Sequence, residues 1–181
     1  MSVKPSRTLV LIRHAKAESQ LGAESDHVRP LALKGRSQAS QLGRDLAAQS
    51  LIPQVVLCSS ALRTRQTWEL VSGTLLQAVS GSHSGPQVLV TDDLYSASSK
   101  DLIGLVQEHG GDASIVFVVG HEPTISMAAD SLAGAGSESA AAAQVRVGVP
   151  TGTACILRVG QEWSGLSRSS AVLEKVFRPA I

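Results

Sequence analysis

The chain has 181 residues, of which 43% are hydrophobic and 17% are charged, so it can fill one core and is too apolar for a disordered protein. Its formal net charge is only +1, and this balance does not favour binding to nucleic acid or to an anionic membrane. We therefore expect residues 1–181 to form a single domain, with any charged binding site confined to a small part of the surface.

The two cysteines, Cys58 and Cys155, are too few for a disulfide framework. Each lies in an apolar run, where a buried thiol packs as a small hydrophobic side chain. The first apolar stretch, residues 9–12, is far too short for a signal-peptide core or a membrane span. We therefore expect a cytoplasmic protein that does not interact with membranes.

The first half of the chain alternates between strand and helix patterns. Residues 8–12 are β-branched and aliphatic, which is typical of a strand buried on both faces in a parallel sheet. A polar loop follows at residues 15–30, and apolar residues with helical spacing occupy positions 39–46. A second buried strand is predicted at residues 55–58, and a helix at about 63–75.

The second half continues this alternation. Residues 80–86 have the composition of a surface loop, and no element is predicted for residues 133–144. The other expected strands and helices lie at residues 87–90, 100–108, 115–119, 125–132, 153–159 and 171–177. Strands that alternate with helices of this length predict an α/β sandwich with a mainly parallel sheet.

Basic and imidazole side chains follow three of the buried strands. Arg13 and His14 end the first strand. Ser59 and then Arg63 follow the second strand, and His121 follows the strand at 115–119. Each of these is weak evidence alone, because short motifs of this kind are common by chance. Together they predict a site, because parallel sheets gather ligands at the carboxyl ends of their strands.

This set of side chains suits a phosphoryl group. Guanidinium groups match phosphate oxygens and stay charged at every relevant pH. A neutral imidazole is a nucleophile near pH 7 when a backbone carbonyl fixes its tautomer, and a second, protonated histidine would stabilise the transferred group. We expect activity to fall between pH 8 and pH 5 as the nucleophilic histidine takes up a proton. No metal or cofactor is required, and the histidines lack the local spacing of a zinc site.

Five segments resemble the histidine phosphatase superfamily, and within it the small phosphohistidine phosphatases of the SixA type. The segments occur in the family's order, and they are residues 11–18 (LIRHAKAE), 29–35 (RPLALKG), 59–67 (SSALRTRQT), 119–123 (VGHEP) and 150–154 (PTGTA). Two positions depart from the common pattern, because Ala15 replaces a glycine and Ser60 replaces a proline. The resemblance implies a phosphoglycerate mutase-like three-layer α/β/α sandwich, here without a large cap subdomain.

The resemblance also implies roles for individual residues. His14 would be the nucleophile that forms a covalent phosphohistidine. The implied phosphate contacts are Arg13, Arg29, Ser59, Arg63 and His121. The implied partner is a phosphorylated substrate, in particular a protein that carries phosphohistidine.

The general acid is the uncertain part of this scheme. Members that act on phosphate monoesters carry a glutamate after a Leu-x motif, and Ser96 stands at that place here. Asp26 is the candidate acid by resemblance to the SixA type, although it could equally be a capping residue of its loop. Asp92 and Asp93 lie near Ser96, so the acid could also be one of these, or absent. A site without a strong acid favours phosphohistidine, because imidazole leaves more readily than an alkoxide.

Three other functions compete with this scheme: one stays open and two are disfavoured. A phosphatase for small phosphomonoesters such as sugar phosphates or nucleotides would share the fold. A non-catalytic phosphate-binding module is disfavoured, because binding alone does not need the histidine nucleophile. A cysteine phosphatase loop needs five residues between Cys and Arg, and only four separate Cys58 from Arg63.

Overall fold

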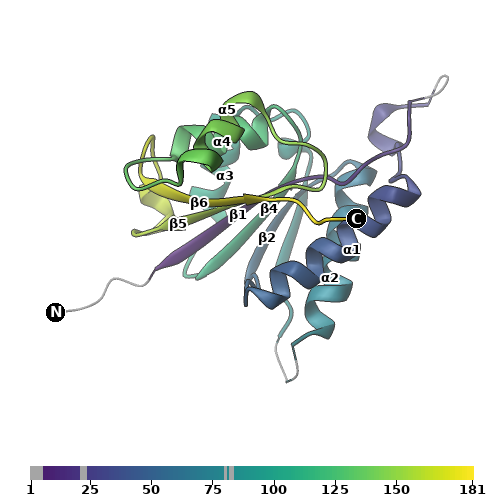
Figure 1. Cartoon of the computed structure of the whole chain (residues 1–181), viewed down its shortest axis with the longest axis horizontal. Coiled ribbons are helices and arrows are strands. Elements are labelled where there is room, and N and C mark those ends of the chain that lie inside the picture. Colours follow the sequence, from purple (N-terminus) through teal and green to yellow (C-terminus); the bar gives the residue numbers. More distant parts are fainter. Residues whose placement is uncertain (1–5, 21–23, 80, 82–83) are drawn as a thin grey trace.

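The computed structural model describes residues 6–20, 24–79, 81 and 84–181. Its centre is a six-stranded sheet with the strand order β3-β2-β4-β1-β5-β6 (Figure 1). The four strands β1 to β4 pair in parallel, and β5 pairs antiparallel with both β1 and β6. The strands are β1 (Arg7–Arg13), β2 (Val55–Ser59), β3 (Gln87–Thr91), β4 (Ile115–Gly120), β5 (Ala154–Val159) and β6 (Ala171–Phe177).

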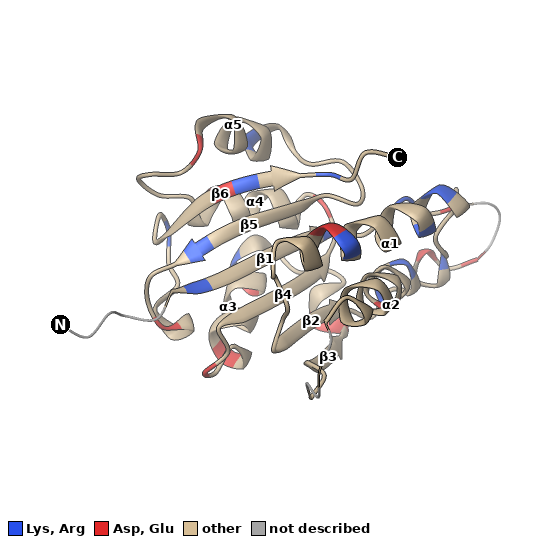
Figure 2. Ribbon diagram, turned by 60° about the horizontal axis from the view of Figure 1, so that its bottom comes forward, with Lys and Arg blue, Asp and Glu red and all other residues tan. Residues whose placement is uncertain are grey.

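Helices cover both faces of the sheet, which confirms the predicted three-layer arrangement. The pair α1 and α2 packs on one face, and α3, α4 and α5 pack on the other (Figures 1 and 2). The helices are α1 (Leu33–Ala48), α2 (Leu62–Gln77), α3 (Ser99–His109), α4 (Thr124–Leu132) and α5 (Ser139–Val147). None of the helices in the described ranges is long and apolar enough to cross a membrane.

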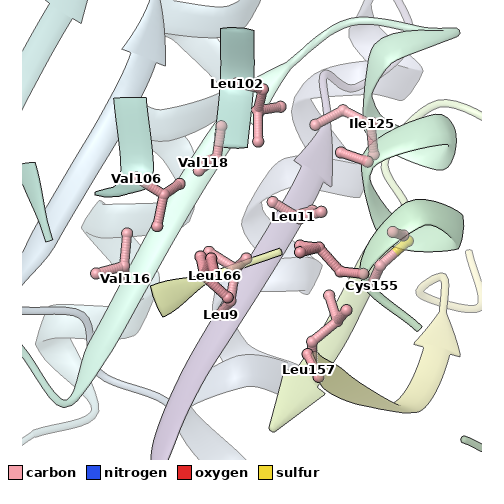
Figure 3. Packing of buried hydrophobic residues seen from close by; sticks show 14 of the residues in the cluster. Leu9, Leu11, Leu102, Val106, Val116, Val118, Ile125, Cys155, Leu157 and Leu166 are labelled. Atoms are coloured by element: carbon pink, nitrogen blue, oxygen red, sulfur yellow. The ribbon is translucent and has the colours of Figure 1, made fainter. Parts of the chain in front are cut away.

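The central strands are apolar on both faces because each face meets a helical layer. Leu9 and Leu11 of β1 belong to the cluster beneath α3 and α4 (Figure 3). Val10 and Ile12 alternate with them and belong to the cluster beneath α1 and α2. All four side chains are fully buried, as the continuous apolar run predicts for a parallel sheet.

Helix α1 lies unusually close to its neighbours because of two glycines. A Cβ on Gly35 would lie 1.9 Å from the carbonyl oxygen of Lys16, and one on Gly43 would lie 2.3 Å from that of Val71. The Lys16 carbonyl also accepts a hydrogen bond of 2.9 Å from the amide of Ala32, directly before α1. The glycine in the segment RPLALKG therefore lets the start of α1 fix the loop that follows His14.

The structure adds three features that the sequence patterns do not predict. Helix α5 forms within a small-residue stretch, where Glu138 accepts hydrogen bonds from the amides of Ala140 and Ala141. The 3₁₀ turn η1 (Asp26–Val28) lies within the predicted loop at 15–30, and η2 (Asp92–Leu94) lies in a segment for which no element was predicted. The antiparallel pairing of β5 is the third feature, because apolar periodicity carries no strand direction. Residues 80, 82 and 83 of the predicted loop at 80–86 lie outside the described residues.

Candidate active site

The carboxyl ends of β1, β2 and β4 bring the predicted site residues together. These strands are neighbours in the sheet, with β4 between β1 and β2. The amide of His14 donates to the carbonyl of Gly120 at 3.0 Å, so the ends of β1 and β4 are in register. The rings of His14 and His121 are consequently 5.4 Å apart, centroid to centroid.

The His14 ring has a fixed tautomer. Its Nδ1 lies 2.8 Å from the carbonyl oxygen of Ala15, so Nδ1 carries the proton and donates it, and Nε2 keeps a lone pair. The amide of Ala15 in turn donates to Oγ1 of Thr67 at 3.0 Å, which holds this turn against α2. His14 is only 7% exposed. The arrangement therefore presents one unprotonated nitrogen on a rigid ring.

Burial is also the main reason that His14 stays neutral. It lowers the pKa of His14 to about 3, and the nearby Arg63, His121 and Arg13 act in the same direction against the hydrogen bond to Ala15. The predicted fall in activity between pH 8 and pH 5 therefore does not follow from His14. The imidazole of His14 stays neutral throughout that range.

Arg13 is held by the segment between α5 and β5. Its Nη1 donates to the carbonyl of Val149 at 2.7 Å, while Nε is buried and has no partner among the described residues. Glu122 fixes this contact, because its carboxylate accepts from the amide of Val149 at 3.1 Å and from the hydroxyl of Ser126 at 2.7 Å. Glu122 thus positions Arg13 indirectly, a role that the sequence motif does not reveal.

Arg63 projects from the first turn of α2 and contacts two other predicted residues. Its Nη1 donates to the backbone carbonyl of Asp26 at 2.9 Å, and its Nη2 donates to Oδ2 of Asp26 at 3.0 Å. Nη2 also lies 3.3 Å from Nδ1 of His121. The Nε of Arg63 is buried and, like that of Arg13, unpartnered within the described ranges. Two buried guanidinium N–H groups thus lack an acceptor, which is what an anion would supply.

His121 is neutral in this arrangement. Its Nδ1 accepts from Arg63, so Nε2 carries the proton and donates to Oγ of Ser59 at 2.7 Å. Burial first, and Arg63 second, lower the pKa of His121 to about 4. The geometry therefore gives a neutral second histidine in place of the protonated one that the sequence predicted. The charge of the site comes from its arginines.

Asp26 lies beside the pocket as a carboxylate with three partners. Oδ1 accepts from Arg29 at 2.8 and 3.1 Å, and Oδ2 accepts from Arg63 at 3.0 Å and from the Tyr95 hydroxyl at 2.8 Å. Burial alone would raise the pKa of Asp26, but these hydrogen bonds outweigh it and hold the pKa well below its usual range. A carboxyl group that stays ionised has no proton to donate. This argues against the general-acid role predicted for Asp26.

Arg29 and Ser59 contact protein groups here. Arg29 donates to Asp26 and to the carbonyl of Glu18 at 3.1 Å. The Ser59 hydroxyl is fully buried and holds His121. Their predicted contacts with substrate stay predictions, and the geometry gives them positioning roles for Asp26 and His121.

The sequence reasoning missed the outer part of the site. Tyr95 bonds Asp26, and its ring packs edge-on against His121 at 5.6 Å and against His27 at 5.0 Å. His27 in turn contacts Ser60 through Nε2 at 2.9 Å. The sequence held a signal for both residues, because each is next to a position at which the general acid was sought: His27 follows Asp26, and Tyr95 precedes Ser96. The pattern of strand ends did not include them.

Other chemistries find little support in the described residues. No group of three or more His, Cys, Asp or Glu side chains there could hold a metal ion. Cys58 is buried, and burial raises the pKa of its thiol to about 12. A protonated thiol is a poor nucleophile, in agreement with the failed loop spacing.

Comparisons with known proteins agree with this geometry. The sequence model of the histidine phosphatase superfamily, branch 1, matches residues 9–81. An uncharacterized protein of Mycobacterium leprae, ML1117, is 32% identical over 167 residues, which is 90% of this chain and 96% of that one. A proposed phosphohistidine phosphatase SixA from Nakamurella multipartitia has 34% identity and a TM-score of 0.82, covering 97% of this chain and 98% of its own.

A more distant structure shares the fold. A proposed alpha-ribazole-5'-P phosphatase from Escherichia coli is 19% identical, with a TM-score of 0.62 over 96% of this chain and 97% of that one. Full-length matches above 30% identity, together with the histidine and arginine pocket, settle the family. The chain is a phosphatase that belongs to the histidine phosphatase superfamily and has the architecture of its SixA-type members.

Proposed function

We propose that this phosphatase removes phosphoryl groups from phosphohistidine on proteins, through a covalent phosphohistidine at Nε2 of His14. One observation carries the proposal: the buried His14 ring is locked with Nδ1–H on the Ala15 carbonyl and with Nε2 unprotonated. Binding a phosphate would not require this tautomer, whereas nucleophilic attack does. The alternative of a non-catalytic binding module is therefore disfavoured.

The arginines account for binding of the phosphoryl group. The unpartnered Nε donors of Arg13 and Arg63 would bind phosphoryl oxygens, and their fixed positions avoid reorganisation during transfer. His14 Nε2 then attacks phosphorus, and the electron pair of the broken bond goes to the leaving group. The phosphorylated ring keeps its Nδ1–H on Ala15 and therefore carries a positive charge. That charge makes His14 a good leaving group when water attacks phosphorus.

His121 would change state when the anion binds. A phosphoryl dianion beside the ring favours the charged imidazole, so it would raise the pKa of His121 above its value of about 4. Nδ1 then carries a proton and donates to the anion, and Nε2–H keeps its contact with Ser59. The protonated second histidine expected from the sequence would thus form with substrate bound.

The preference for phosphohistidine rests on the leaving group. A positioned acid contributes about 10²–10⁴-fold to reactions with poor leaving groups such as alkoxides. Asp26 is held as a carboxylate and Ser96 has no carboxyl group, so neither of these positions supplies a carboxylic acid for this step. We further propose that residues 1–181 act as one domain without a large cap, which lets a side chain on a folded protein reach His14. The relative from Nakamurella multipartitia carries the same proposed activity.

Turnover of a phosphohistidine protein, measured beside a panel of sugar phosphates and nucleotides under the same conditions, tests the substrate. A kcat/KM for the phosphohistidine protein at least 10²-fold above every ester supports the proposal. A higher kcat/KM for a small ester would instead favour the second candidate, a phosphomonoester phosphatase, whose fold the proposed alpha-ribazole-5'-P phosphatase shares.

A further inference from the structure

Imidazole leaves phosphohistidine more readily when its far ring nitrogen is protonated, so a proton donor near the leaving group would speed the reaction. In an in-line displacement the leaving group departs from the side of phosphorus opposite the nucleophile. His14 is only 7% exposed, so the leaving group would lie on the solvent side of the phosphoryl group. Asp26 is held as a carboxylate and cannot supply the proton. A donor would therefore have to be another group near the leaving group.

His27 is a candidate for this donor. Its side chain is 39% exposed, and its ring packs edge-on against Tyr95 with centroids 5.0 Å apart. Tyr95 in turn packs against His121 at 5.6 Å, so His27 is one ring farther out than His121. Its neighbour Ser60 directly follows Ser59, which bonds His121. His27 thus lies on the solvent side of Tyr95 and His121.

The contacts of His27 determine where its protons are. Nε2 lies 2.9 Å from Oγ of Ser60, and that hydroxyl donates its own proton to Oδ1 of Asp92. Ser60 therefore accepts from Nε2–H. The Asp92 carboxylate also lies 3.8 Å from Nε2, close enough to pair with a protonated ring. Among the contacts of the described residues Nδ1 has no partner, so its proton is the one that can be given away.

The other charged groups near His27 are paired with one another. Asp26 precedes it in η1, but both carboxylate oxygens of Asp26 are occupied by Arg29, Arg63 and Tyr95. The positive charges of Arg29 and Arg63 are thereby paired locally. Asp92 is left as the carboxylate that faces the imidazole through Ser60.

We infer that His27 is the general acid of this enzyme, with Ser60 and Asp92 holding it in place. This inference rests on the proposed attack by His14. With phosphohistidine, Nδ1–H of the His27 imidazolium passes its proton to the far nitrogen of the substrate imidazole. His14 Nε2 forms its bond to phosphorus, the substrate P–N bond breaks, and its electron pair stays on the leaving nitrogen, which departs as neutral imidazole.

Hydrolysis of the intermediate restores both histidines. Water attacks phosphorus, gives one proton to Nδ1 of neutral His27, and the electron pair of the P–N bond returns to Nε2 of His14. Phosphate leaves, His14 is neutral with Nδ1–H on Ala15, and His27 is again an imidazolium. An imidazolium is matched in acidity to a leaving imidazole, which fits phosphohistidine better than an alkyl ester.

The test is the dependence of His27→Gln on the leaving group, read as the ratio of kcat/KM for phenyl phosphate to that for 2,4-dinitrophenyl phosphate. The first leaving group needs a proton and the second does not. We expect this ratio to fall about 10²-fold in the variant, and turnover of a phosphohistidine protein to fall as well. Asp92→Asn should lower the ratio by less. His109→Gln is the matched control, because His109 also lies 3.8 Å from a carboxylate, Glu108, but on α3.

The outcomes separate the two proposals. An unchanged ratio, or an equal loss with both aryl phosphates, would overturn the role of His27. A lowered ratio in an enzyme that does not hydrolyse phosphohistidine proteins would support His27 and refute the proposed substrate. Activity of His14→Ala toward 2,4-dinitrophenyl phosphate close to that of the wild type would refute the nucleophile, whatever His27 does.

Discussion

Replacement of Asp26 by asparagine tests whether this residue is a structural carboxylate. The amide keeps one acceptor oxygen, so either Arg29 or the pair Arg63 and Tyr95 loses its partner on the side chain of residue 26. The Arg63 side chain is only 7% exposed, so water cannot replace the lost contact. A hydrogen bond to a charged group contributes about 1.5–3 kcal/mol. We therefore expect Asp26→Asn to lower the free energy of unfolding by about 2 kcal/mol at pH 7.

The pH dependence of that difference is the sharper part of the test. The pKa of Asp26 is lowered in the folded state, so its stabilising effect is fully present above the unfolded value of 3.8 and is lost progressively as the pH falls from there through the lower folded pKa. Urea unfolding of the wild type and Asp26→Asn should differ by about 2 kcal/mol at pH 7 and by less at pH 3. The exposed Asp112→Asn serves as the control. A difference that is equal at both pH values would refute the reasoning.

Two further predictions concern packing and the buried histidines. Gly43→Ala should lower the free energy of unfolding by about 1–3 kcal/mol, because its Cβ would meet the Val71 carbonyl. Gly73→Ala in α2 has open space around the new Cβ and should be neutral or stabilising. Urea unfolding of both variants tests this prediction, and equal effects on stability would contradict it. Because the pKa of His14 is lowered in the folded state, the free energy of unfolding falls as the pH decreases from 6.5 toward about 3. In His14→Asn the free energy of unfolding should therefore depend less steeply on pH between 6.5 and about 4 than in the wild type. An unchanged slope would contradict the argument from burial.

The sequence predicted the fold and the inner pocket because both follow from strong local patterns. Buried runs such as residues 115–119 are unambiguous, and parallel strands place their carboxyl ends on one edge whatever the details of packing. Arg13, His14 and His121 are therefore brought together as expected. Their catalytic roles stay predictions of the proposed function.

The protonation states were not predictable, because they depend on contacts between distant segments. Asp26 is ionised because Tyr95, 69 positions away, and Arg63 both donate to it. His121 is neutral because Arg63 donates to its Nδ1. No motif encodes these geometries, and the same applies to the contact of His27 with Ser60. The identity of the acid was consequently the point at which reasoning from the sequence alone reached its limit.

The most direct test of the account is the chemical identity of the phosphorylated enzyme. Enzyme mixed with a labelled phosphoryl donor is quenched within one turnover, in alkali and in acid, and the labelled peptide is sequenced. We expect alkali-stable, acid-labile phosphate on His14, and no labelled peptide from His14→Ala. Acid-stable label on Cys58 or on a serine, or labelled His14→Ala, would contradict the central claim that Nε2 of His14 is the nucleophile.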